Sequence, residues 1–303
     1  MAQAQGSRHS ISYVPEVTFG VTPATPSMIA LRHTETTLDV VKGANQSNEI
    51  RDDRQIAHFR HGVRRAEGGI EFEWSYGSQD DFLEAALGGS WATNVLKAGT
   101  TFRSFTIERA FADVSEFMPY TGCAIDGFTL EAGPEGLITG AFQVIGAGGL
   151  TPASSALDAS VTAAPTTEPF TGFQGSISEG GSAAKITAFS LNLSNGLEAT
   201  YVIGSSSVNN MTMGLSNVTG SISALFESET LLNKFLAETE SSLTLVMTDA
   251  AGNDVTIDMS RIKYTGASVP VASGSQGLLI QMPFQALRDA GDGSNVVITR
   301  APA

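Results

Sequence analysis

Apolar and polar residues alternate along several short segments of this chain, which is the pattern of strands that bury one face. The alternation is clear in 104–108, 126–132, 185–193, 242–248 and 254–259. Two other stretches, 81–87 and 229–236, place apolar residues at helical spacing instead. The pattern therefore predicts a mainly β protein of antiparallel strands with two short helices.

The same order of elements occurs twice along the chain. A strand around Ile70 precedes the first helical stretch, and a strand around Ile222 precedes the second. Each half then passes a Tyr-Thr-Gly triplet, at 120–122 or 264–266, and ends in an apolar strand that contains Phe-Gln. Because internal repetition changes the prediction for the whole fold, we interpret the chain as two copies of one unit with one helix each.

Apolar side chains of the two helical stretches are expected to face the core of each copy. These residues are Phe82, Leu83 and Leu87 in the first copy, and Leu232, Phe235 and Leu236 in the second. The length of 303 residues suits two domains of ordinary size. We expect an N-terminal arm at 1–27, a first repeat at 28–148, a proline-bearing linker at 149–170, a second repeat at 171–290 and a C-terminal tail at 291–303.

The first repeat contains a long charged loop at 40–66, whereas its counterpart at 204–217 is shorter and nearly uncharged. Long structureless loops inside compact domains are more often functional than filler. The contact residues expected in this loop are Asn48, Glu49, Arg51, Asp52, Asp53, Arg54, Arg60, Arg64 and Arg65. Their mixed charges suit contact with an acidic protein surface. Since the rest of the chain is acidic, we expect another copy of the chain as the partner.

Charge and cysteine content limit the function classes. The formal net charge of −14 argues against a tight nucleic-acid binder. Cys123 is the single cysteine, so no internal disulfide can form. The N-terminus lacks the apolar core of a signal peptide, and no apolar run reaches the roughly 20 residues that span a bilayer. These observations predict a soluble chain made in the cytoplasm, without membrane contact.

Candidate metal-binding and catalytic groups have simpler interpretations. His58 and His61 have a spacing that can hold a metal on one helix face, but the neighbouring arginines disfavour a bound cation. Glu71 and Glu73 alternate with apolar residues, so a solvated strand face is favoured over a catalytic acid pair. The acidic segment 289–295 lacks the terminal glutamate of a calcium loop and is expected to be a turn. With no nucleophile elbow or phosphate-binding loop, the sequence predicts neither an enzyme nor a cofactor.

A further signal comes from four segments of the chain, 13–26, 47–55, 77–89 and 248–253. Together they resemble tail tube proteins of long-tailed, non-contractile bacteriophages. The resemblance implies a major tail protein that polymerises as stacked rings around a central channel. It also implies β-sandwich domains with a flanking helix, six to a ring, whose sheets join edge to edge into a closed inner barrel. In this family a long loop between early strands reaches the adjacent ring, which corresponds to 40–66 here, and there are no catalytic residues to transfer.

Two units per chain would let three chains close a ring of six units, with a ring of six chains as the alternative. The resemblance places the chain in the virion tail, with tape measure, terminator and tail-tip proteins as further partners. DNA would pass through an acidic channel without specific binding, because a basic lumen would hold its phosphates. We expect Glu71, Glu73 and Glu108 to include channel-lining positions.

Two other function classes remain as alternatives. A two-domain β-sandwich adhesin or binding module needs a secretion signal, which the N-terminus lacks. A glycan hydrolase needs an acid pair in a cleft with aromatic sugar platforms, and Trp74 and Trp91 are the only tryptophans. A structural subunit is therefore the leading hypothesis.

Overall fold

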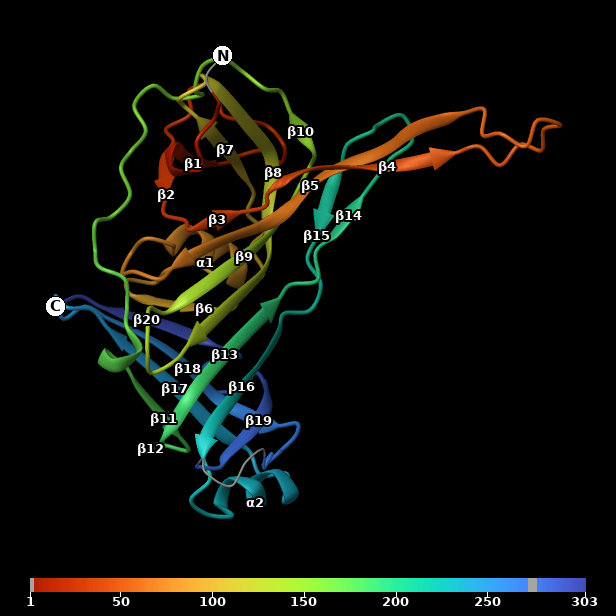
Figure 1. Cartoon of the computed structure of the whole chain (residues 1–303). Coiled ribbons are helices and arrows are strands. Elements are labelled where there is room, and N and C mark those ends of the chain that lie inside the picture. Colours follow the sequence, from red (N-terminus) through yellow and green to blue (C-terminus); the bar gives the residue numbers. More distant parts are fainter. Residues whose placement is uncertain (1–2, 272–276) are drawn as a thin grey trace.

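The computed structural model describes residues 3–271 and 277–303 and is mainly β, with a short α-helix in each half (Figure 1). The first half contains β1 (His9–Pro15), β2 (Ile29–Leu31), β3 (Glu35–Thr36), β4 (Asp39–Gln46), β5 (Phe59–Glu73), α1 (Asp80–Leu87), β6 (Val95–Lys97), β7 (Phe105–Phe111), β8 (Glu116–Ala132), β9 (Thr139–Gly146) and β10 (Gly149–Leu150). The second half contains β11 (Ser176–Glu179), β12 (Ser182–Ala183), β13 (Ile186–Ser194), β14 (Glu198–Thr200), β15 (Asn210–Thr212), β16 (Asn217–Leu225), α2 (Thr230–Leu236), β17 (Ser241–Thr248), β18 (Asp254–Tyr264), β19 (Leu279–Ala286) and β20 (Val297–Ala301). The prediction of a mainly β chain with two short helices is confirmed.

β8 is the long central strand of the first half. Its first part pairs with β7 as far as Cys123, and its second part pairs with β9 from Ala124 onward. β7 also pairs with β1, and β9 also pairs with β5, which in turn pairs with β3 and β4. The resulting strand order is β1–β7–β8–β9–β5–β4, and α1 follows β5 along the chain.

β18 has the corresponding place in the second half. It pairs with β17 as far as Ile262 and with β19 from Ile262 to Tyr264. The strand order is β11–β17–β18–β19–β16–β13, and α2 follows β16 along the chain. The Tyr-Thr-Gly triplets are not at equivalent places in this order. Tyr120 precedes the point at which β8 changes partner, whereas Tyr264 follows the corresponding point on β18.

Strands β8 and β13 join the two halves into one sheet. They pair antiparallel from Gly127↔Ser194 to Ala132↔Phe189. β8 therefore lies between β9 and β13, and a continuous antiparallel sheet runs β4–β5–β9–β8–β13–β16–β19 (Figure 1). The sheet formed by the described residues is open, so a single chain does not form the closed barrel.

Asn195, directly after β13, links this joint to α1. Its side-chain Nδ2 donates to the carbonyl oxygens of Ala86 at 2.7 Å and Ile125 at 3.1 Å, and the residue is fully buried. Its backbone N–H donates to the Asp126 carbonyl at 2.7 Å. A buried carbonyl without a partner costs about 1–3 kcal/mol, so these bonds hold the two halves in one arrangement.

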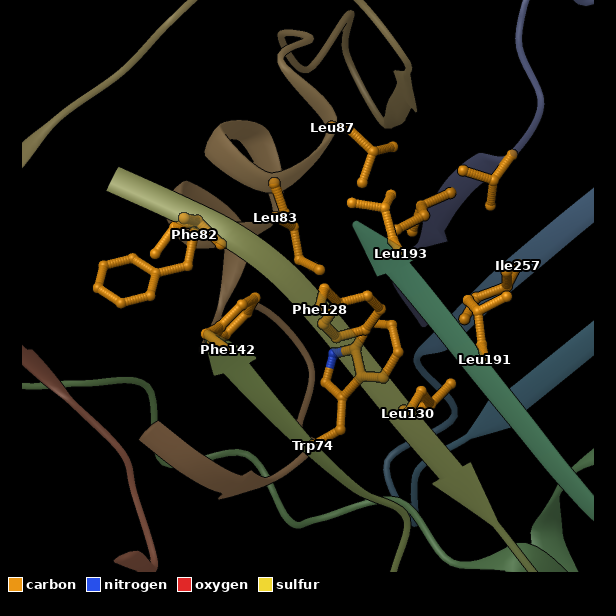
Figure 2. Packing of buried hydrophobic residues seen from close by; sticks show 14 of the residues in the cluster. Trp74, Phe82, Leu83, Leu87, Phe128, Leu130, Phe142, Leu191, Leu193 and Ile257 are labelled. Carbon is orange, nitrogen blue, oxygen red and sulfur yellow. The ribbon is translucent and has the colours of Figure 1, made fainter. Parts of the chain in front are cut away.

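A large hydrophobic cluster crosses the joint between the halves. Figure 2 shows Trp74 and Phe128 of the first half beside Leu191 and Leu193 of β13. The rings of Trp74 and Phe128 meet edge to face with their centroids 5.7 Å apart, which is a favoured aromatic geometry. Burying each large apolar side chain contributes roughly 1.5–3 kcal/mol. The two halves therefore share one core.

Three segments that were expected at the margins of the fold belong to its body. β1, within the expected N-terminal arm, pairs with β7 along its whole length. Phe170, at the end of the expected linker, is fully buried, and its N–H donates to the Trp74 carbonyl. β20, within the expected C-terminal tail, pairs with both β18 and β6. Their proline-bearing or short sequences contain too few alternating positions to indicate strands.

Candidate channel face and assembly surfaces

One face of the continuous sheet is buried against the core, and the described residues leave the other face open. We call the uncovered side the polar face. It contains Glu71, Glu73, Thr129, Glu131, Gln143, Ser190, Asn192, Thr219, Ser221, Gln281 and Gln285. Directly opposite residues on neighbouring strands point to the same side. Thr129 lies opposite Asn192, which lies opposite Thr219, which lies opposite Gln285, so the face crosses both halves.

Eight of these eleven side chains are polar and uncharged, and three are carboxylates. Glu71 and Glu131 are exposed, and Glu73 is half-buried. Glu71 and Glu73 are two of the three acids expected at a channel. Glu131 was not anticipated, although its alternation with Phe128 and Leu130 is the same kind of signal.

Glu108 does not belong to the polar face. It lies on β7, is only 2% exposed, and accepts a hydrogen bond from the Leu157 N–H at 2.9 Å. Burial raises the pKa of the Glu108 carboxyl, and the Leu157 N–H opposes that change. A carboxylate covered by its own chain cannot line an open channel, so the expectation for Glu108 is wrong. Alternation in the sequence could not show that residues near 157 cover this side of β7.

Residues 39–67 form a hairpin in place of the structureless loop that was expected. β4 pairs with the first part of β5 from Asp39↔Glu67 to Gln46↔Phe59, and 47–58 form the tip. Figure 1 shows this long hairpin projecting from the body of the protein. Among the expected contact residues, Arg60, Arg64 and Arg65 lie on β5 and the other six lie in the tip. A ribbon that is exposed on both faces has no apolar alternation, which is why the sequence did not indicate its strands.

The long hairpin is cationic within an acidic protein. Residues 40–66 contain six arginine or lysine and three acidic side chains, a net charge of +3, which leaves −17 for the rest of the chain. Arg51 lies 3.4 Å from the Asp53 carboxylate and 4.0 Å from that of Glu49. Among the described residues, neither Arg54 nor Arg60 has an ion-pair partner. These two positive charges are therefore available to another surface.

Large apolar side chains are also exposed near the end of the long hairpin. Ile50 is 99% exposed, Ile56 63% and Phe59 57%. An isolated two-stranded hairpin is at best marginally stable in water. Exposed apolar side chains on such a ribbon indicate a surface that becomes covered in an assembly.

A short hairpin, formed by β14 and β15 between β13 and β16, supports the base of the long one. The backbone N–H of Arg64 donates to the Ser206 carbonyl at 2.7 Å, and its Nε donates to Ser207 Oγ at 3.1 Å. Val208 and Met211 pack into a small apolar cluster with β8 and β9 residues. The long hairpin is therefore fixed at its base, and the part between Arg64 and the tip extends away from the short hairpin.

The sequence model of the family described as phage tail tube protein matches residues 6–286. The chain belongs to the phage tail tube protein family. No curated protein matches it. The matched region contains the polar face, the long hairpin and both helices, so the chain is a structural subunit of the tail tube in the virion. Such subunits assemble with copies of themselves and act with other tail proteins, and a structural family of this kind is generally non-enzymatic.

The two helices of this tail tube protein are packed differently. Phe82, Leu83 and Leu87 of α1 are fully buried, and the Trp91 ring covers the helix with its Nε1 donating to the Asp80 carbonyl. No residue of α2 is fully buried. The expected core residues Leu232 and Phe235 are half-buried, and Leu236 is 67% exposed. The expectation that Leu236 faces the core is therefore wrong, because no segment equivalent to that of Trp91 covers α2 in the described chain.

The remaining candidate residues for metal binding or catalysis lie on the exposed hairpin, in the core and in a turn. His58 and His61 are exposed on the long hairpin, and the described residues contain no cluster of three metal-binding side chains. Cys123 is buried in the core, which raises the pKa of its thiol. Asp289 accepts hydrogen bonds from the N–H groups of Gly291 and Asp292, as in a simple turn. In the part of the chain that the structure describes, no helix is long and apolar enough to cross a bilayer.

Proposed function

We propose that this tail tube protein forms rings of three chains, which stack into the tube of a long-tailed, non-contractile phage and enclose a channel for DNA. In this proposal, 28–148 and 171–290 are two copies of one tube unit, connected by 149–170. The matching strand orders around β8 and β18 support it, as do the matching places of α1 and α2. Six units then close a ring of three chains with pseudo-sixfold symmetry.

The joint between β8 and β13 gives a pattern for closing the ring. β18 is the counterpart of β8, and β3 with β4 is the counterpart of β13. Beyond β18 the chain continues along β19, with the Thr265 N–H bound to the Pro283 carbonyl and Ser268 opposite Gln281. We infer that the outer edge of 265–271 pairs with the outer edge of β3 in the next chain. Ring closure would then satisfy strand edges that otherwise invite uncontrolled association.

The polar face is the observation that supports a channel most directly. It extends over strands of both halves and presents polar, uncharged side chains together with Glu71, Glu73 and Glu131. Tight binding to DNA requires clustered lysine or arginine that releases counterions from the phosphates. A lumen formed by the polar face would lack such a cluster, so DNA would pass along it without being held.

The long hairpin supports stacking of the rings. Its net charge of +3 complements the acidic body of another chain, and its exposed apolar side chains need a cover. The two faces of a ring differ, so contacts between rings are heterologous and extend the assembly as a filament. In this proposal the chain is made in the host cytoplasm, has no catalytic role, and meets tape measure, terminator and tail-tip proteins in the virion.

The mass of the smallest ring tests the stoichiometry. Three chains of 31.6 kDa give about 95 kDa, which mass photometry at low protein concentration would measure. Electron microscopy class averages along the axis of tubes formed at higher concentration should show six similar lobes with threefold differences. A ring of twice that mass would contradict the three-chain ring. Protein that remains a monomer at every concentration would contradict the tube assembly itself.

A further inference from the structure

We propose that the long hairpin of one subunit docks on the end of another subunit that contains α2. This end, here the α2 end, comprises residues 225–240 and Leu278. The inference rests on the proposed stacking of rings and identifies the surface that receives the hairpin. It is based on exposed apolar side chains, unpaired charges and the number of each surface per chain.

The α2 end has an apolar surface that the described residues leave exposed. Leu225, Phe226 and Leu278 are exposed at the ends of β16 and β19, where the Phe226 N–H donates to the Leu278 carbonyl. The chain enters α2 shortly after Phe226, and Leu236 is exposed in the last turn of the helix. Figure 1 shows α2 at one extremity of the protein. Exposed apolar side chains gathered at one extremity indicate a binding surface.

The charge of the α2 end is opposite to that of the long hairpin. Residues 225–240 contain four glutamates and one lysine, a net charge of −3, against +3 for residues 40–66. Glu227 is paired with Lys185 and Glu240 with Arg261. Glu229 and Glu238 are exposed, and neither forms an ion pair within the described residues. These two carboxylates are opposite in charge to Arg54 and Arg60 of the hairpin, which also form no ion pair among the described residues.

The surface beside α2 also contains an open hollow with charged walls. A hollow of about 600 Å³ is lined by Lys234, Glu240, Arg261 and Asp289, among others. Its walls thus present both charge signs, as does the hairpin tip with Glu49 and Arg51. Alternating charges of this kind fix the register of an interface more than they raise its affinity.

Each chain has one long hairpin and one α2 end that can receive the hairpin of another chain. The long hairpin belongs to the first half, whereas the second half has the short, nearly uncharged hairpin at the same place. Among the described residues the more exposed helix, α2, belongs to the second half, whereas α1 is covered by Trp91 and its neighbours. One hairpin and one α2 end per chain allow every hairpin to be occupied and every helix to be covered when rings stack.

Charge exchange tests this docking. The variants are Arg54→Glu with Arg60→Glu in the hairpin, Glu229→Lys with Glu238→Lys at the α2 end, and all four together. Each charge-reversed pair should raise the protein concentration needed for tube formation about tenfold or more, because like charges then meet. The variant with all four substitutions should form tubes at close to the concentration that wild type needs. If it is no better than the separate pairs, or if the α2 variant polymerises like wild type, the docking is wrong.

A control with the same change of net charge uses Glu135→Lys with Glu168→Lys, two exposed glutamates outside the proposed contact. It should polymerise like wild type, and a similar loss in this control would attribute the effect to net charge alone. Ring mass separates this proposal from the one on which it rests. Charge-reversed variants that form rings of about 95 kDa but do not stack support both proposals. Wild-type protein that forms no rings contradicts the proposed assembly of rings, on which the docking rests.

Disulfide trapping gives an independent test. Cys123 is buried, so cysteines introduced as Arg54→Cys and Glu229→Cys would be the exposed thiols of the chain. Oxidised tubes of this variant should give a ladder of covalent oligomers on a non-reducing gel, and unstacked rings should not. A variant with Arg54→Cys and Glu135→Cys should give no ladder. Equal ladders from both variants, or none from either, would contradict the contact.

Discussion

His9 and His33 are held together as neutral side chains near the start of β1. His9 Nδ1 lies 3.0 Å from His33 Nε2, and Arg109 Nε donates to His9 Nε2 at 3.2 Å. Burial, Arg109 and His33 lower the pKa of His9 from 6.5 to about 4, and burial also lowers the pKa of His33. Since Nε2 of His9 accepts a hydrogen bond, the folded state requires that nitrogen to be unprotonated.

We expect the protein to lose stability as the pH falls from about 6.5 to about 4, because the unfolded chain takes up a proton on His9 more readily. The stabilisation is fully present above pH 6.5 and, allowing for solvent screening, amounts to about 1 kcal/mol. The melting temperature of wild type minus that of His9→Gln should therefore be larger at pH 7 than at pH 4.5. His58→Gln on the exposed hairpin is the control, with equal differences at both pH values. A difference that does not change with pH for His9→Gln would contradict the prediction.

At the residue scale, alternation in the sequence identified many of the buried positions and missed what covers them. Phe142 and Phe284 are buried in β9 and β19, the two strands that contain Phe-Gln. Leu236 and Glu108 were misplaced for a common reason. Whether a residue on a helix or strand face meets solvent depends on another segment of the chain, and local periodicity contains no information about that segment.

At the scale of elements, one partly buried ion pair links α2 to the sheet, beside the packing of Leu231, Leu232 and Phe235 against the core. Lys234 Nζ lies 2.7 Å from both carboxylate oxygens of Glu179 on β11, and the Tyr264 hydroxyl donates to the same carboxylate at 2.9 Å. The Glu179 side chain is only 8% exposed. A buried carboxylate that loses its cation retains the cost of its desolvation.

Lys234→Met should therefore destabilise the protein by about 3 kcal/mol, because it leaves Glu179 charged and buried. Urea unfolding monitored by circular dichroism measures this change. The double variant Lys234→Met with Glu179→Gln should recover part of the loss. Lys185→Met is the matched control, since its ion pair with Glu227 is exposed and should contribute less than about 1 kcal/mol. Equal losses from the two lysine variants would show that burial of Glu179 has no role.

Some features of the long hairpin could be predicted from its own residues, and others could not. Its charge and its length were apparent from the residues, and these led to the prediction of a contact with another copy. Its two strands were not apparent from the sequence, because Val41 and Val63 are exposed together with the polar residues around them and give no apolar alternation. The backbone pairing of β4 with β5 forms this ribbon, and no buried face is needed for such pairing.

At the scale of the whole molecule, the proposed assembly uses two kinds of contact. Ring closure pairs strand edges through backbone hydrogen bonds, whereas stacking brings together surfaces with charges of +3 and −3. Salt screens exposed charges strongly, since the Debye length falls from about 10 Å at 0.1 M to about 3 Å at 1 M. Backbone pairing between strands is much less sensitive to salt.

We therefore expect tubes to shorten or dissolve into rings when sodium chloride is raised from about 0.1 M to about 1 M, because screening weakens stacking before ring closure. Light scattering would follow the loss of tubes, and mass photometry after rapid dilution would measure the rings. Tubes of the variant with all four charge reversals should show the same salt dependence as wild-type tubes. Rings and tubes that disappear at the same salt concentration would contradict the separation of the two contacts.

The order of the main strands and the two helices was accessible from the sequence, whereas β1, β4, β20 and the joint between the halves were not. Repeated elements and their alternation indicate which segments are strands, but strand partners are chosen by contacts between residues far apart in the chain. The pairing of Phe128 with Leu193 is one such contact. Proline and small residues at 149–170 suggested a separating linker, whereas the sheet and the core pass directly from one half to the other.

This joint has a consequence for how a ring comes together. In a ring of three chains, every second junction between sheets forms during folding, and it costs no translational or rotational freedom of separate molecules. The two halves meet at an effective concentration that dilution cannot change. Rings of this kind should persist at lower protein concentrations than rings of six separate units. Damage at the β8–β13 pairing would appear as a loss of folded protein, whereas damage at the edge of 265–271 would leave a folded chain that no longer joins its neighbours.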